Sequence, residues 1–150
     1  MQRNRVDQKP LTWLLFAALF IPYEALAMHY LYLPPLFGVL FFLYIRALET
    51  QQSLPFFAVV FMLLVAETSK GYLLLSTLFF FTVSYFLLLP KLRSAVSCRL
   101  CLNAIIVVLA YVGYWAFAAL FAKMFALPLP QLDYRVVFYM IIEFFLIGLL

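Results

Sequence analysis

The sequence predicts an all-α fold: a polytopic membrane protein whose six transmembrane helices form one bundle. Of its 150 residues, 69% are hydrophobic and only 11% are charged, whereas a soluble domain carries about 25% charged residues. The chain therefore has too few charges to cover an aqueous surface. Residues 54–66 and 72–89 are uncharged apolar runs joined by a polar hinge at 66–71. Such runs are typical of helices that cross a bilayer.

The six predicted helices are the apolar runs between prolines, glycines and polar loops. They cover about residues 11–30, 34–48, 54–70, 72–89, 100–127 and 136–150. Pro22 lies inside the first run, where it is expected to kink the helix. Together the helices make a single integral membrane domain over residues 1–150, with no room for a soluble catalytic domain.

Local signals set the expected helix ends. Pro34 and Pro35 are expected at the first helical positions of the second helix, where the missing N–H has no cost. Ser53 is a suitable N-cap for the third helix. Gly71 is expected to close that helix as a C-terminal glycine, and Pro90 is expected to end the fourth helix.

The basic residues lie at the helix ends and predict the orientation. With a cytoplasmic N-terminus, the cytoplasmic side would hold Arg3, Arg5, Lys9, Arg46, Lys91, Arg93 and Arg99, and the outer side Lys70, Lys123 and Arg135. Because cytoplasmic loops are enriched in Lys and Arg, both termini are expected in the cytoplasm. The net charge of +4 forms no basic stripe, so it does not indicate nucleic-acid binding.

Ionisable residues inside the predicted bundle are the candidate site, because such groups are costly in a bilayer and often functional. They are Glu24, Glu67, Lys70, Lys123 and Glu143, and Gly71 lies beside them in the hinge. Glu143 lies about 12 Å into the last helix at 1.5 Å per residue. Glu67 and Lys70 are spaced i, i+3 and are expected to pair. Lys123 is expected to snorkel or to meet a carboxylate.

Two interpretations of these residues remain open. In one, the carboxylates line an outward-facing cavity that binds a ligand or carries protons. In the other, which we favour, they pair across helices or contact a partner and hold the bundle in register. No metal site or cofactor is expected, because His29 is the lone histidine and has no cysteine nearby.

Cys98 and Cys101 form a C-x-x-C motif, and they are the only cysteines. Their basic neighbours place them on the reducing, cytoplasmic side, so we interpret them as small residues at a helix start rather than as a redox pair. No hydrolase, metalloprotease or phosphate-loop motif is present, so the sequence does not predict an enzyme.

Two stretches carry a resemblance to a known family. Residues 33–44 (LPPLFGVLFFLY) contain a proline that opens a helix with an aliphatic, aromatic and tyrosine pattern. Residues 65–72 (VAETSKGY) contain an acidic residue followed by a polar, glycine-containing turn. Both stretches resemble the bacterial rod-shape-determining protein MreD family, with Glu67 where the family more often has Asp. The resemblance covers about residues 33–89, and the other helices agree in layout only.

The resemblance implies a non-enzymatic scaffold of the cell-elongation, peptidoglycan-synthesis complex in the bacterial inner membrane. Its expected partners are an MreC-like single-pass membrane protein, wall-synthesis enzymes and the lipid bilayer, with contacts at the outer helix ends and at residues 67–71. The family is also similar in fold to the substrate-binding subunits of energy-coupling-factor transporters. The alternative is therefore a small-molecule-binding subunit whose pocket opens outward near Glu24, Glu67 and Glu143.

Overall fold

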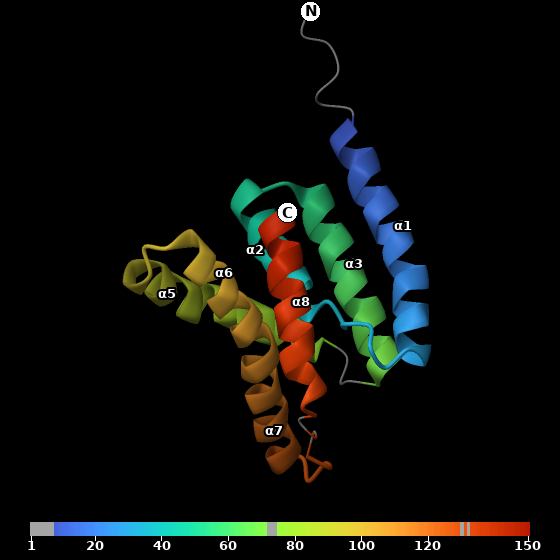
Figure 1. The fold of residues 1–150 in the computed structure, drawn as a ribbon, viewed down its shortest axis with the longest axis vertical. Coiled ribbons are helices and arrows are strands. Elements are labelled where there is room, and N and C mark those ends of the chain that lie inside the picture. The colour runs from blue at the N-terminus through green and yellow to red at the C-terminus, as the bar shows by residue number, and fades with distance from the viewer. Residues whose placement is uncertain (1–7, 72–74, 130, 132) are drawn as a thin grey trace, which may run out of the picture.

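The computed structural model describes residues 8–71, 75–129, 131 and 133–150. Within them the fold is all-α, with six continuous helical stretches (Figure 1). Four are simple helices: α1 (Gln8–His29), α2 (Phe37–Thr50), α3 (Ser53–Lys70) and α8 (Arg135–Leu149). One stretch joins α4 (Ser76–Val83), η1 (Ser84–Leu88) and α5 (Leu89–Ala95). The other joins α6 (Arg99–Val108), η2 (Leu109–Gly113) and α7 (Tyr114–Met124).

Four of these stretches are long and apolar enough to cross a membrane. They are Leu11–His29, Ser53–Lys70, Ser76–Ala95 and Arg99–Met124. The other two, α2 and α8, have 14 and 15 residues and are shorter than such a span. The predicted all-α membrane protein is thus confirmed with four candidate spans. α1 begins and α8 ends on the same side of the bundle, which is also the side where α2 leads into α3 (Figure 1).

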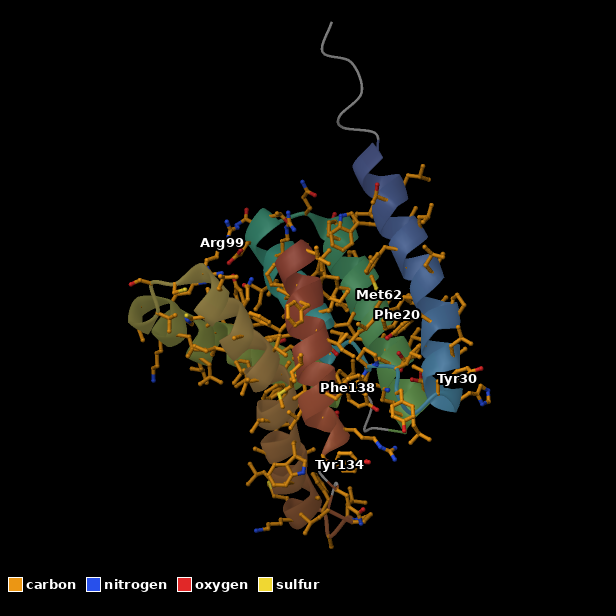
Figure 2. The ribbon with its side chains drawn as sticks, viewed as in Figure 1. Phe20, Tyr30, Met62, Arg99, Tyr134 and Phe138 are labelled. Carbon is orange, nitrogen blue, oxygen red and sulfur yellow. The ribbon has the colours of Figure 1, made fainter. Side chains whose placement is uncertain are left out.

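The central helix is α2, which packs against α3, α6, η2 and α8. Nine of its 14 residues are buried, as expected for a helix whose charged residues, Arg46 and Glu49, lie only near its end. Phe41 of α2 meets Phe81 of α4 with ring centroids 4.5 Å apart. α1 lies along the outer side of α3, with Phe20 and Met62 buried at this interface (Figure 2).

The outward faces of the bundle carry large apolar side chains. Phe138 on α8 is 51% exposed, and Phe57 on α3 is 68% exposed. Figure 2 shows apolar side chains of this kind projecting from the outer helices. Soluble monomers rarely expose such wide apolar surfaces, whereas lipid solvates them. The exposed surface is therefore consistent with a bilayer environment.

The structure corrects two predicted helix starts. Pro34 and Pro35 lie before α2, in a buried non-helical segment, and α2 begins only at Phe37. Pro34 precedes Pro35 and is therefore disfavoured in the α conformation. Leu36 adopts a left-handed conformation at φ 56, so the helix can begin only after it. Ser53 is the first residue of α3 and not its N-cap. The cap position belongs to Gln52, which makes no side-chain capping bond.

Two predicted helix ends also change. Pro90 does not end the fourth stretch, which continues to Ala95. The wide π turn η1 lies directly before Pro90, and the Leu89 N–H bonds to the carbonyl of Ser84, so the backbone accommodates the missing proline donor. The fifth stretch ends at Met124 instead of residue 127, since the chain turns through Ala126 at φ 53 ahead of Pro128.

Other predicted features agree with the structure. Gly71 follows α3 at φ 67, and its N–H bonds to the carbonyl of Glu67, which confirms the predicted glycine C-cap. α1 continues through Pro22 without interruption, which agrees with one helix over this run, whereas the expected kink stays a prediction. The predicted last helix agrees with α8 within one residue at each end. The expected start of the fourth helix at residue 72 lies outside the described residues, and α4 is described from Ser76.

Candidate functional site

In the described part of the chain, three carboxylates are almost completely buried: Glu24, Glu67 and Glu143 are 1%, 0% and 0% exposed. They come from α1, α3 and α8. A buried carboxylate is tolerated only when donors or cations satisfy it. The partners of these three residues therefore define what the polar interior of the bundle does.

Glu67 caps the start of α4. Its Oε2 accepts a hydrogen bond from the backbone N–H of Leu75 at 2.7 Å, and its Oε1 accepts one from the N–H of Thr77 at 2.5 Å. Leu75 is the N-cap residue, at φ 69, and its own side chain makes no capping bond. The first N–H groups of a helix have no partner within the helix. The carboxylate of Glu67, from the preceding helix, is the acceptor for these groups.

This arrangement corrects the predicted pairing of Glu67 with Lys70. The i, i+3 spacing allows that ion pair, but both oxygens of Glu67 face backbone donors of α4. Lys70 instead lies 3.4 Å from Oε1 of Glu24. Inside the bundle, the backbone N–H groups have no water to bond to, whereas a lysine at a helix end can pair with another carboxylate. Glu67 therefore bonds to the helix start and not to Lys70.

Glu143 performs the same task for α2. Its Oε2 accepts a hydrogen bond from the backbone N–H of Val39 at 3.1 Å, and its Oε1 accepts one from the hydroxyl of Tyr111 in η2. The N-cap of α2 is Leu36, at φ 56 and again without a side-chain capping bond. A Cβ added at Gly38 would lie 2.6 Å from Oε2. Gly38 therefore makes room for the carboxylate.

Two helices of the bundle thus begin in the same way. Each starts after a leucine with positive φ, lacks a cap of its own and receives a glutamate from another helix. A negative charge at a helix N-terminus is favourable because of the helix dipole, and charge-assisted bonds to N–H groups are strong. In lipid no water could replace these bonds. The two carboxylates close helix starts that would otherwise be unsatisfied.

Glu24 joins α1 to α3. Its Oε1 accepts a hydrogen bond from the hydroxyl of Ser69 at 2.9 Å and lies 3.4 Å from Nζ of Lys70. Its Oε2 has no partner among the described residues. Lys70 is 23% exposed and also lies 5.9 Å from the ring centroid of Phe37 in α2. The ammonium group therefore connects three helices near one end of the bundle.

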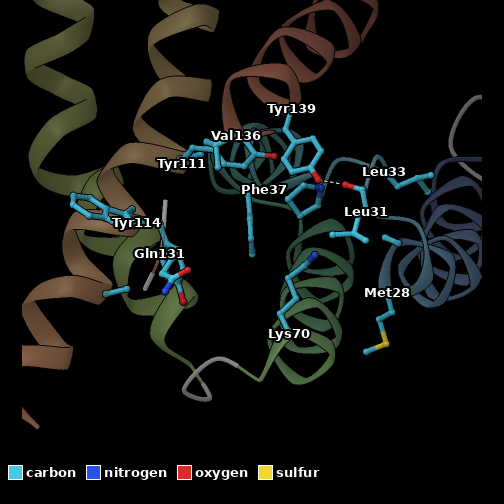
Figure 3. A pocket seen from close by; sticks show the side chains of 15 residues that line it. Met28, Leu31, Leu33, Phe37, Lys70, Tyr111, Tyr114, Gln131, Val136 and Tyr139 are labelled. Atoms are coloured by element: carbon cyan, nitrogen blue, oxygen red, sulfur yellow. Dashed lines mark hydrogen bonds between the residues drawn. The ribbon is translucent and has the colours of Figure 1, made fainter. Parts of the chain in front are cut away.

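A cavity of about 330 Å³ opens beside Lys70. Its polar lining is Lys70, Tyr111, Tyr114, Gln131 and Tyr139, and its apolar lining includes Met28, Leu31, Leu33, Phe37 and Val136. Figure 3 shows the Lys70 side chain rising from α3 toward Phe37 and Tyr139, and the hydroxyl of Tyr139 bonding to the carbonyl of Leu31. Glu143 does not line the cavity, but it accepts a hydrogen bond from Tyr111, which does.

The remaining predicted residues lie apart from this interior. Lys123 is exposed near the end of α7 and forms no ion pair among the described residues. Gly71 is exposed, and a Cβ added there would meet nothing within 4 Å. Cys98 and Cys101 are free and exposed. In the described ranges no cluster of three or more His, Cys, Asp or Glu residues could hold a metal ion.

Sequence reasoning did not identify the partners of the carboxylates. Tyr111 lies within an apolar run, and its hydroxyl was the only indication of a polar contact there. A buried tyrosine hydroxyl usually has a hydrogen-bond partner. Gly38, one of four glycines in the chain, stands in a helix interior, and such a position indicates close approach by another group. Ser69 was visible only as part of the polar hinge.

Comparison with family models, with curated proteins and with solved structures finds no match to this chain.

Proposed function

We propose that this protein is a non-enzymatic scaffold of the cell-elongation complex in the bacterial inner membrane. The observation that carries the proposal is the use of the buried carboxylates. Glu67 and Glu143 bond to helix starts, and Glu24 bonds to Ser69 and Lys70. Groups held in this way fix the shape of a bundle and leave it rigid enough to present a surface. The resemblance of residues 33–89 to the MreD family supplies the kind of complex.

The proposal includes six membrane crossings. α2 and α8 are about 21–22 Å long at 1.5 Å per residue, which is short for a bilayer, but α2 is preceded by a buried segment. The non-helical segment before α2 contains the buried Pro34 and Pro35, and irregular backbone at membrane depth is tolerated where protein covers it. An even number of crossings also agrees with α1 beginning and α8 ending on one side (Figure 1).

The proposed orientation follows the basic residues. Arg46, Arg93 and Arg99 line one hollow at the end of the bundle where α8 finishes, whereas Lys70 and Arg135 belong to the opposite helix ends. Positive-inside asymmetry then supports cytoplasmic termini. The partner surface would lie on the outer side, around the exposed Thr68 and Gly71, with Glu67 shaping this turn from within.

The test is a mild-detergent pull-down from the native membrane, followed by mass spectrometry. Recovery of an MreC-like single-pass protein and of wall-synthesis enzymes is expected. A Glu67→Gln variant, compared at equal protein level with Gln52→Ala, should recover less partner because the turn is distorted. Gln52 is the control because it is exposed at the opposite end of α3 and makes no side-chain capping bond. Recovery of an ATPase-coupled transport module instead would overturn the scaffold.

The cavity beside Lys70 favours a second candidate, a small-molecule-binding subunit of the energy-coupling-factor type. A site of about 330 Å³ with one cation and several tyrosine hydroxyls is within the range that holds a small ligand. Native mass spectrometry of the purified protein distinguishes the two. A co-purified small molecule that is lost in Lys70→Met but kept in Lys123→Met would favour the binding subunit over the scaffold.

A further inference from the structure

A second hollow lies at the opposite end of the bundle from Lys70, between α2, α6 and α8. Its volume is about 620 Å³, and three arginines line it: Arg46, Arg93 and Arg99. Arg93 of α5 pairs with Glu49 of α2, which also lines the hollow. Arg46 and Arg99 form no ion pair among the described residues. The lining therefore carries three positive charges against one negative charge.

Beside the arginines, the accessible wall of this hollow is apolar. Leu100 of α6 and Leu149 of α8 are 63% and 87% exposed, and Phe42 of α2 is half-buried. A charged rim above an apolar wall matches the two parts of an amphiphile, its charged headgroup and its apolar chain. A free inorganic anion would use the rim and leave the wall uncovered.

The start of α6 adds to the positive end. Its first residues, Arg99 and Leu100, line the hollow, so the positive end of the helix dipole lies near the rim. Figure 2 places Arg99 at this corner, close to the end of α2. Helix starts favour phosphate oxygens through the helix dipole.

We propose that this hollow binds one anionic phospholipid, with its phosphate between Arg46 and Arg99 and an acyl chain along Phe42, Leu100 and Leu149. Guanidinium groups bind phosphate through paired N–H donors, and basic pockets between membrane helices select anionic headgroups. The inference rests on the protein being embedded in a membrane. It is independent of the proposed scaffold role, so either can fail alone.

The test uses the full chain, purified and delipidated in a neutral maltoside detergent. Native mass spectrometry and thermal unfolding are recorded with phosphatidylglycerol, with phosphatidylcholine and with inorganic phosphate. Wild-type protein should retain phosphatidylglycerol adducts and should melt at a higher temperature with this lipid. Phosphatidylcholine should bind more weakly, and inorganic phosphate should not raise the melting temperature.

The variants are Arg99→Gln and Arg46→Gln, with Lys123→Gln as the matched control. Arg99→Gln is the decisive change, because Arg46 also lines a neighbouring hollow beside α1. Both arginines are exposed, so each variant should fold, which the melting temperature without lipid checks. Loss of a charge-assisted phosphate contact predicts about tenfold weaker phosphatidylglycerol binding, and Lys123→Gln should bind as the wild type does.

Three results would overturn this proposal. Equal retention of phosphatidylcholine and phosphatidylglycerol would indicate bulk lipid without a headgroup site. Unchanged lipid binding in Arg99→Gln would remove the rim from the interaction. Stabilisation by inorganic phosphate equal to that by the lipid would mean that the apolar wall plays no part.

Discussion

Replacing Glu67 by Gln should destabilise the protein more than the same replacement at Glu143. An amide has one acceptor oxygen and one NH₂ donor in place of two acceptor oxygens. Both partners of Glu67 are backbone N–H groups, those of Leu75 and Thr77. One of these two N–H groups must then face the NH₂ group of the introduced Gln side chain, itself a donor, and stay without an acceptor in a buried position. A lost charge-assisted bond together with a stranded donor costs roughly 2–4 kcal/mol.

At Glu143 the partners are chemically different. Val39 contributes a backbone N–H, but Tyr111 contributes a hydroxyl, which can donate or accept. The Gln oxygen can therefore keep the Val39 N–H while its NH₂ donates to the Tyr111 oxygen. The Tyr111 hydroxyl proton can turn toward the cavity that Tyr111 lines. The loss is then mainly the difference between charged and neutral hydrogen bonds, which amounts to about 1 kcal/mol.

The assay is reversible denaturant unfolding in detergent, followed by far-ultraviolet circular dichroism. Thr68→Ala is the control for α3, because Thr68 is exposed and its hydroxyl bonds only to carbonyls of its own helix. This control should change the free energy of unfolding by at most about 0.5 kcal/mol. Equal losses in the two Gln variants, or a larger loss at Glu143, would refute the capping geometry.

Three further predictions follow from the same contacts. Gly38→Ala should cost about 1–3 kcal/mol by crowding the Glu143 carboxylate; in a Glu143→Ala background this cost should shrink, and a double-mutant cycle without coupling would contradict the close approach. Gly71→Ala should cost about 1–2 kcal/mol in thermal unfolding, from the positive φ alone; a neutral result would mean that the turn adopts another conformation. Hydrogen bonding from Cys101 lowers the pKa of Cys98, so more Cys98 thiolate is present at neutral pH. Maleimide should therefore label Cys98 faster in the wild type than in Cys101→Ala at about pH 7, and this difference should vanish above the ordinary thiol pKa of about 8.5. Equal labelling rates at neutral pH would exclude this hydrogen bond.

The existence and order of the helices follow from the apolar runs, because lipid requires every spanning backbone to be helical. Gly71 was predictable for a local reason: a glycine directly after a polar helix end supplies the left-handed residue that closes the helix. Pro34 and Pro90 were misjudged since the usual proline positions describe isolated helices. Here the buried segment before α2 keeps Pro34 outside the helix, and the π turn before Pro90 lets the helix continue through that proline.

The carboxylate partners could not be predicted from spacing. Glu143 and Val39 are 104 residues apart, and Glu24 and Ser69 are 45 residues apart. A local rule favoured Glu67 with Lys70, but it could not include the unsatisfied N–H groups of a helix that begins after the hinge. Which donors compete for a buried acid is decided by the packing of whole helices, and no periodicity in the sequence records it.

The capping of α4 by Glu67 can be measured most directly by NMR on isotope-labelled protein in micelles. A scalar coupling across the hydrogen bond should connect the amide nitrogen of Thr77 with the side-chain carboxyl carbon of Glu67, and the Thr77 amide should exchange slowly with solvent. Absence of the coupling, together with an amide that exchanges as fast as an exposed one, would contradict the account.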